Sequence, residues 1–183
     1  MSSSTEKRRG PSGCLVVIIV VVLLLTFSGS RREEEAKNNA QQAVTVTDAA
    51  SAARLAFDAC DPSLIDLTNV LANDGEVVMN VHVKWSSNHK NDVINCCWLM
   101  LDMCDIIFDR DDVDYFSIVY AADLIDSFGN ESTQNVFMLG LTKETAAQCN
   151  FPNLHTMTVQ STRRIIDLMD KKMMHPVIQD DIF

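Results

Sequence analysis

Four aspartates lie close together near the middle of the chain: Asp109, Asp111, Asp112 and Asp114. A hard cation such as Ca²⁺ is bound by several carboxylates from one loop, which makes this stretch the chain's candidate metal site. The spacing departs from an EF-hand loop, because Val113 occupies the third ligand position and no glycine follows. We therefore interpret the stretch as a solvated acidic loop. We predict no metal and no cofactor, and these four residues are the weak candidates for a metal site.

The histidines do not form a recognisable catalytic or metal-binding pattern. None has a partner at the spacing of a zinc site or of a catalytic triad. The sequence also lacks the G-x-S-x-G, H-E-x-x-H, P-loop and G-x-G-x-x-G motifs. We predict structural or surface roles for all four histidines and no catalytic residue. They are His82, His89, His155 and His175.

Five cysteines follow residue 31, and they contain no C-x-x-C pair. Adjacent Cys96 and Cys97, next to Trp98, could be imagined as a nucleophile. A thiol on an apolar helix face has a raised pKa, however, and is inert. We predict free, buried cysteines that pack as small apolar residues. The five are Cys60, Cys96, Cys97, Cys104 and Cys149.

The elements that position these groups are clearest in residues 63–122. Residues 76–85 alternate apolar and polar side chains, which predicts a half-buried antiparallel strand. Asn73-Asp74-Gly75 predicts a hairpin turn, which makes 63–72 the partner strand. Residues 91–109 carry apolar residues on one face of a helix. Residues 115–122 are apolar on both faces, which indicates a central strand.

The remaining segments complete a repeated pattern. Residues 126–133 are rich in turn formers, and 136–142 predict a strand. Thr142 is expected to cap a short helix to about residue 149, and 159–174 predict a helix that Pro176 ends. With a helix at 47–60, the order gives two helix–strand–strand units plus a C-terminal helix. We predict an α+β domain with a four-stranded, mostly antiparallel sheet and helices on one face.

An apolar segment near the amino terminus predicts where the protein resides. Residues 14–27 carry no charge, and the uncharged window spans 21 residues from 10 to 30. At about 1.5 Å per residue this is close to the ~30 Å of a bilayer core. A single-pass signal-anchor helix is one interpretation. The other is a signal peptide cleaved near Ser30, which gives a secreted domain.

We divide the chain into a basic tail (1–13), a transmembrane signal-anchor helix (14–30), a polar stalk (31–43) and one acidic α+β domain (44–183). Lys and Arg are balanced on the two sides of the apolar segment, so orientation rests on the short basic start, which favours an extracytoplasmic domain. Residues 44–183 contain 21 Asp and Glu against nine Lys and Arg. Such a surface repels phosphate backbones, so we expect no nucleic-acid partner.

These observations leave three functional hypotheses. The first is a membrane-anchored, non-catalytic interaction module that contacts the bilayer through residues 14–30 and binds an unknown protein or small molecule. The second is an enzyme whose site is assembled from scattered residues. The third is an assembly subunit: a basic start, Gly13, an apolar helix and a four-stranded sheet resemble the layout of type IV pilin-like proteins. The glutamate of those proteins is absent here, since residues 15–27 contain no acid.

Overall fold

The computed structural model describes residues 33–43, 46, 48–86 and 88–182. The chain divides into two compact units, Met1–Glu35 and Ala36–Phe183, and the sheet with its helices belongs to the second. The predicted anchor at 14–30 lies outside the described residues and stays a prediction. Residues 33–43, which include most of the predicted stalk, are helical. The domain boundary at residue 44 also stays a prediction.

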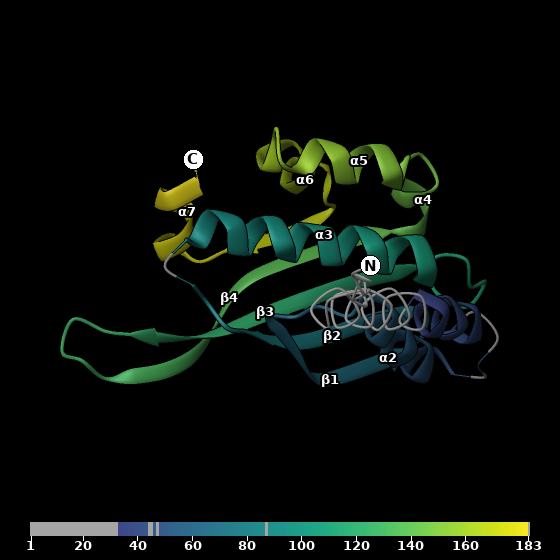
Figure 1. Ribbon diagram of the computed structural model, residues 1–183, viewed down its shortest axis with the longest axis horizontal. Coiled ribbons are helices and arrows are strands. Elements are labelled where there is room, and N and C mark those ends of the chain that lie inside the picture. Colours follow the sequence, from purple (N-terminus) through teal and green to yellow (C-terminus); the bar gives the residue numbers. More distant parts are fainter. Residues whose placement is uncertain (1–32, 44–45, 47, 87, 183) are drawn as a thin grey trace, which may run out of the picture. The chain divides into compact units, whose positions relative to one another are not determined.

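The domain contains a sheet and several helices, so the α+β class is confirmed (Figure 1). Its first helix–strand–strand unit is α2 (Ala49–Cys60), β1 (Ile65–Asn73) and β2 (Glu76–Val83). The second is α3 (His89–Ile107), β3 (Tyr115–Ile125) and β4 (Glu131–Thr142). The chain then continues through α4 (Lys143–Ala146), α5 (Phe151–Thr158), α6 (Thr162–Leu168), β5 (Lys171–Met174) and α7 (Pro176–Ile182).

The sheet has five strands in the order β1-β2-β3-β4-β5. Strands β2 and β3 are parallel, whereas the other three neighbouring pairs are antiparallel. The predicted four-stranded sheet is therefore wrong in strand number, and the sheet is mixed. The parallel pair arises because α3 carries the chain from the end of β2 back to the start of β3. Strand β3 lies in the centre, as its apolar sequence predicted.

The predicted turn between β1 and β2 is confirmed. Asp74 and Gly75 both have positive φ angles, 48° and 80°. A two-residue hairpin turn with both angles positive matches the twist of the two strands, and Asx-Gly is the sequence that tolerates it. The turn therefore fixes the register in which Asn73 pairs with Glu76.

Helices lie in two layers over one face of the sheet. Helix α3 contacts β3 and β4 on one side and α5 and α6 on the other, and it also contacts α7, so most of its side chains are buried (Figure 1). Helix α2 packs against α3, β1 and β2. The apolar face predicted for 91–109 is confirmed. Its members Val93, Cys96, Cys97, Met100, Cys104 and Ile107 are 0 % exposed.

The C-terminal prediction of one helix over 159–174 is wrong. Helix α6 ends at Leu168, Met169 adopts an extended conformation, and Lys171–Met174 form β5 against β4. Asp170 lies in the break, where its carboxylate accepts bonds from the backbone N–H and the hydroxyl of Thr142, both at 2.8 Å. Strand β5 also satisfies backbone hydrogen-bonding groups at the edge of β4. Together these hydrogen bonds outweigh the local sequence pattern, which favours a helix.

Candidate functional site

The four aspartates of the acidic loop do not converge on one point. Asp112 accepts hydrogen bonds from Nε of Arg110 at 2.8 Å and from Nη2 at 2.6 Å. These bonds lower the pKa of the Asp112 carboxyl. The side chains of Asp109, Asp111 and Asp114 are exposed. Within residues 33–182, as far as they are described, no three His, Cys, Asp or Glu could hold a metal ion together.

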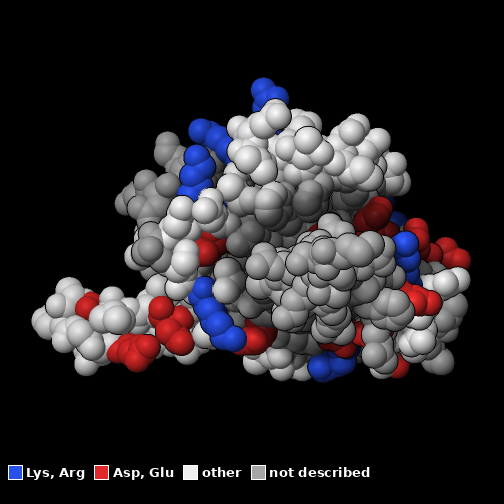
Figure 2. Space-filling view, in the orientation of Figure 1, with Lys and Arg blue, Asp and Glu red and all other residues white. Residues whose placement is uncertain are grey.

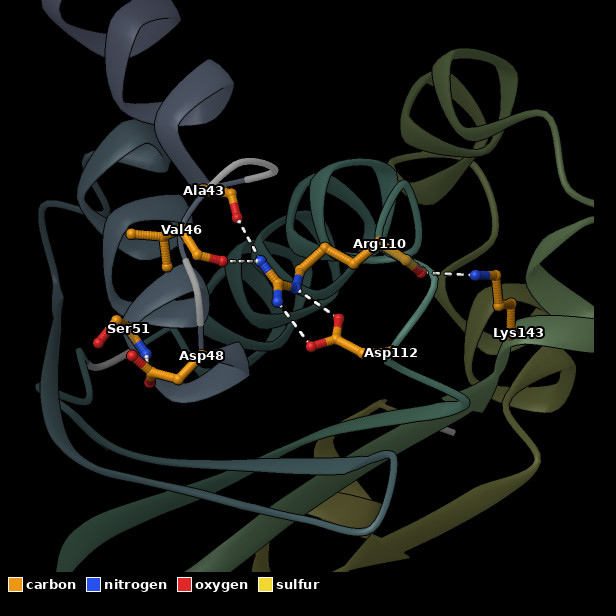
Figure 3. Close-up of polar contacts among 7 residues, drawn as sticks. All are labelled: Ala43, Val46, Asp48, Ser51, Arg110, Asp112 and Lys143. Atoms are coloured by element: carbon orange, nitrogen blue, oxygen red, sulfur yellow. Dashed lines mark hydrogen bonds and ion pairs between the residues drawn. The ribbon is translucent and has the colours of Figure 1, made fainter.

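Arg110 is the centre of a polar cluster that we call the Arg110 junction (Figure 3). The residue is only 6 % exposed. Its Nη1 donates to the carbonyl oxygens of Ala43, at 3.1 Å, and Val46, at 2.7 Å. Nζ of Lys143 donates to the carbonyl oxygen of Arg110 itself. Ala43 is the last described residue of the helical stretch 33–43, so the guanidinium places positive charge against the carbonyl groups on the C-terminal side of that stretch.

The segment that follows the helix is also fixed at its other end. Asp48 is the N-cap of α2 and accepts a hydrogen bond from the backbone N–H of Ser51 at 2.7 Å. This bond lowers the pKa of the Asp48 carboxyl. The connection from the polar helix into the domain is therefore held by Arg110 on one side and by the cap of α2 on the other (Figure 3).

A small cleft lies between the α2–β1 connection, α3 and α5. It has a volume of about 220 Å³ and is lined by Cys60, Trp98, Asp102 and His155 among others. The rings of Trp98 and His155 stack with centroids 5.0 Å apart, and Trp98 Nε1 donates to the carbonyl oxygen of His155. His155 Nε2 lies 3.7 Å from Asp102 Oδ1. Burial raises the pKa of Asp102.

The chemistry of this cleft is poor for a cysteine nucleophile. Burial and the negative charge of Asp102 raise the pKa of the Cys60 thiol to about 12, so the thiol stays protonated at neutral pH. A nucleophilic cysteine needs the opposite environment, with a nearby cation that stabilises the thiolate. The arrangement of Cys60, Asp102 and His155 is therefore better suited to packing and hydrogen bonding than to covalent catalysis.

All five cysteines of the domain are free, which confirms that part of the prediction. Cys96, Cys97 and Cys104 are buried, and burial raises the pKa of each thiol, to about 12 for Cys97. Cys60 and Cys149 are only half-buried, which the sequence pattern did not predict.

The four histidines lie in four different places. His82 Nε2 is 3.2 Å from Asp123 Oδ2, and the ring of His89 lies 5.7 Å from that of Trp85. His155 lies in the cleft described above, and His175 immediately precedes α7.

The most unusual surface feature is the hairpin end of β3 and β4, residues 121–135, which we call the arm. It extends beyond the neighbouring strands, since β2 pairing ends at Ala121 and β5 pairing begins at Phe137 (Figure 1). Its tip carries Ile125 and Phe128, which are 72 % and 89 % exposed. These are the two most exposed large apolar side chains of the described residues.

The tip of the arm is ordered by its own hydrogen bonds. Asp126 Oδ1 accepts from the backbone N–H groups of Phe128 and Asn130, and Oδ2 accepts from Asn130 Nδ2. These bonds from Asn130 lower the pKa of the Asp126 carboxyl. Gly129 completes the turn with a positive φ of 84°. Phe128 is therefore presented to solvent on a structured turn.

The base of the arm is bent and tied to the sheet. A register shift between Tyr120 and Ala121 leaves Val136 as an extra residue in β4, and such a bulge bends the strand that contains it. Asp123 Oδ1 accepts from Thr133 Oγ1 at 2.6 Å, and Oδ2 faces His82. These contacts lower the pKa of Asp123.

The arm also has a distinct charge. Residues 121–135 contain three acidic residues and no Lys or Arg. In Figure 2 the arm shows acidic and uncharged side chains and no basic ones. The arm therefore combines an apolar tip with an acidic surround.

Sequence reasoning missed both the arm and the Arg110 junction. The tip of the arm falls in 126–133, which the sequence predicts as a turn-rich stretch, and Phe128 among the turn formers is the available signal. For the junction, the signal was that Arg110 is the single Lys or Arg between Lys90 and Lys143. A lone cation in a strongly acidic stretch is a natural partner for carbonyl and carboxylate oxygens.

Comparison of the chain with protein-family models, with curated proteins and with solved structures gives no match. None of the helices in the described part of the chain combines the length and the apolar character that a membrane span requires.

Proposed function

We propose that this protein is a membrane-anchored, non-catalytic interaction module whose domain binds a protein partner through the arm. The observation that carries the proposal is the exposure of Phe128 and Ile125 on a structured, protruding hairpin. Exposed large apolar side chains grouped at one place are typical of protein interfaces, and aromatic anchors supply much of the binding energy there.

The acidic surround supports a protein partner over a lipid or nucleic acid. Asp126 and Glu131 lie beside the apolar tip, Asp123 lies nearer the base of the arm, where it faces His82, and residues 121–135 contain no Lys or Arg. Anionic lipid headgroups and phosphate backbones are repelled by this charge, whereas a basic rim around an apolar pocket complements it.

The Arg110 junction supports the anchored part of the proposal. A domain held at a membrane presents its binding site in a defined direction only if the connecting segment is fixed to it. The bonds from Arg110 to Ala43 and Val46 fix to the domain the residues that follow the predicted anchor in the chain. We also propose that the domain lies on the extracytoplasmic side, which the short basic start of the sequence favours.

An enzyme remains the second candidate, and the cleft between α2, α3 and α5 is the observation that favours it. The stacked Trp98 and His155 could bind a flat ligand, and Asp102 with a raised pKa could carry a proton. The protonated Cys60 supplies no nucleophile, so this cleft supports small-molecule binding better than covalent chemistry.

Two experiments test the proposal. Alkaline carbonate extraction should leave the full-length protein in the membrane fraction, and its release would contradict the anchor. Proteins that co-purify with the full-length chain should then be compared quantitatively between wild type, Phe128→Asp and Leu71→Asp. Leu71 is 57 % exposed on the edge strand β1 and serves as the matched control. The arm variant alone should lose the bound protein, and equal recovery from all three would contradict the role of the arm.

A further inference from the structure

A groove at the opposite edge of the sheet from β1 is lined in part by basic side chains, which the arm lacks. It lies between α6, β5 and α7 and has a volume of about 390 Å³. We call it the α6–β5 groove. Apolar side chains and two cations line it together: Phe137, Ile166, Met173, Met174, Arg163 and Lys172.

The groove lies in the most cationic part of the domain. Four of the nine Lys and Arg of residues 44–183 fall within residues 163–172. Asp167 is shared between two of them, 3.2 Å from Lys172 Nζ and 3.7 Å from Arg163 Nε. The second acid of this stretch, Asp170, is bonded to Thr142 instead. Of these residues, Arg163, Lys172 and Asp167 line the groove, which gives its lining two cations and one carboxylate in a domain that is otherwise strongly acidic.

We propose that the tip of the arm of one copy of this chain docks into the α6–β5 groove of a second copy. This inference rests on the proposed function and names the partner. Phe128 enters the apolar lining, and the acidic residues around it face Arg163 and Lys172. Complementary charge favours this encounter, while the like charges elsewhere on two acidic domains disfavour other orientations.

The position of the groove favours a two-fold dimer. Phe137 lines the groove and pairs with Tyr120, next to the bulge at the base of the arm. Phe128 lies in the turn beyond the last strand pair, Ile125 with Glu131. The arm projects away from α6 and α7 (Figure 1), so it holds this turn away from the groove of its own chain. Two copies related by a two-fold axis can each place a tip in the groove of the other. The contact is then made twice and the assembly is closed.

Photo-crosslinking identifies the residues in contact. Full-length protein with benzoylphenylalanine at position 128 is purified in detergent, mixed with ¹⁵N-labelled wild-type protein and irradiated. We expect crosslinked peptides that join position 128 of the unlabelled chain to residues 163–179 of the labelled chain. The same probe at position 71 is the control and should give no such peptide. Crosslinks confined to one chain, or to other regions, overturn the inference.

Charge reversal tests the complementarity independently of the crosslinker. Glu131→Lys and Lys172→Glu should each weaken dimerisation in sedimentation experiments, and the two changes together should restore it. Phe128→Asp should weaken it about 30-fold, as expected for an aromatic anchor of an interface. Leu71→Asp should leave it unchanged. Glu131 and Lys172 are exposed, so their reversal tests docking without disturbing the core.

The outcomes separate this inference from the proposed function. A full-length protein that sediments as one species unaffected by Phe128→Asp and by the charge reversals overturns self-docking. If that protein still needs Phe128 to retain a different protein, the interaction module stands and only the second copy is wrong. If neither self-association nor retention depends on Phe128, both proposals fail.

Discussion

Replacing Arg110 by methionine removes the cation that joins the 33–43 helix to the domain while keeping a long, apolar side chain in its place. The side chain is buried and uses Nε, Nη1 and Nη2 in four hydrogen bonds. Two of these go to Asp112, whose side chain is 52 % exposed. That carboxylate regains water when Arg110 is lost, so the ion pair contributes about 0–1 kcal/mol.

The larger loss comes from the two carbonyl groups. The oxygens of Ala43 and Val46 lose a charged donor, and each such bond contributes about 1.5–3 kcal/mol. Removing a guanidinium from a buried site recovers part of this, because its desolvation no longer opposes folding. We expect Arg110→Met to lower the free energy of unfolding by about 2–4 kcal/mol.

The assay is equilibrium urea unfolding of a fragment that begins at residue 33, followed by the fluorescence of its two tryptophans, Trp85 and Trp98. Arg54→Met, at an exposed position of α2, is the control and should change the free energy by less than about 0.5 kcal/mol. A second fragment that begins at residue 47 lacks both carbonyl partners. In that fragment Arg110→Met should lower the free energy of unfolding by clearly less, because the bonds to Ala43 and Val46 are already absent.

Two results would refute this reasoning. The first is a loss for Arg110→Met no larger than that for Arg54→Met. The second is an equal decrease in the free energy of unfolding in both fragments, which would show that the stabilisation by Arg110 does not come from its bonds to the carbonyl groups. A change in the slope of the free energy of unfolding against urea concentration would instead indicate an altered unfolded or native state.

Further predictions concern the core, the arm and the thiols. Tyr120→Phe should lower the free energy of unfolding by about 1 kcal/mol in urea, because the buried hydroxyl donates to the carbonyl oxygen of Cys96 at 2.7 Å; an unchanged midpoint would contradict this. The pKa of Asp126 is lowered in the folded arm, so its bonds stabilise the turn above the ordinary carboxyl pKa of 3.8 and are lost as the pH falls through the lowered value. The chemical shift of the Phe128 amide should therefore change only when the pH falls below the ordinary carboxyl pKa. A change between pH 5 and 7 would argue against the turn. Cys149, which is half-buried, should react with a thiol reagent before unfolding, whereas the three buried thiols of α3 should react only in denaturant; simultaneous labelling of all would contradict the burial pattern.

Local sequence patterns predicted much of the fold because the determining interactions are short-range. Alternation over 76–85 gave β2, and Asp74-Gly75 gave the turn whose positive φ angles the structure shows. The apolar character of 115–122 on both faces correctly placed β3 in the centre of the sheet. The repeated helix–strand–strand order is also confirmed.

The features that sequence reasoning missed depend on contacts between distant residues. Lys171–Met174 carry a pattern that fits a helix, and only the free edge of β4 makes them a strand. Arg110 bonds to carbonyl groups 67 and 64 residues earlier in the chain, which no local pattern encodes. The exposure of Phe128 depends on where β2 and β5 end, and the sequence does not indicate those end points.

The central claim, that the arm is a protein-binding site, is tested most directly by photo-crosslinking in cells that produce the full-length protein. Benzoylphenylalanine at position 128 should give a light-dependent adduct of higher mass in the membrane fraction, and the same probe at position 71 should give none. The self-docking inference further predicts that the adduct has twice the mass of the chain. No adduct at position 128, or equal adducts at positions 128 and 71, would contradict the account.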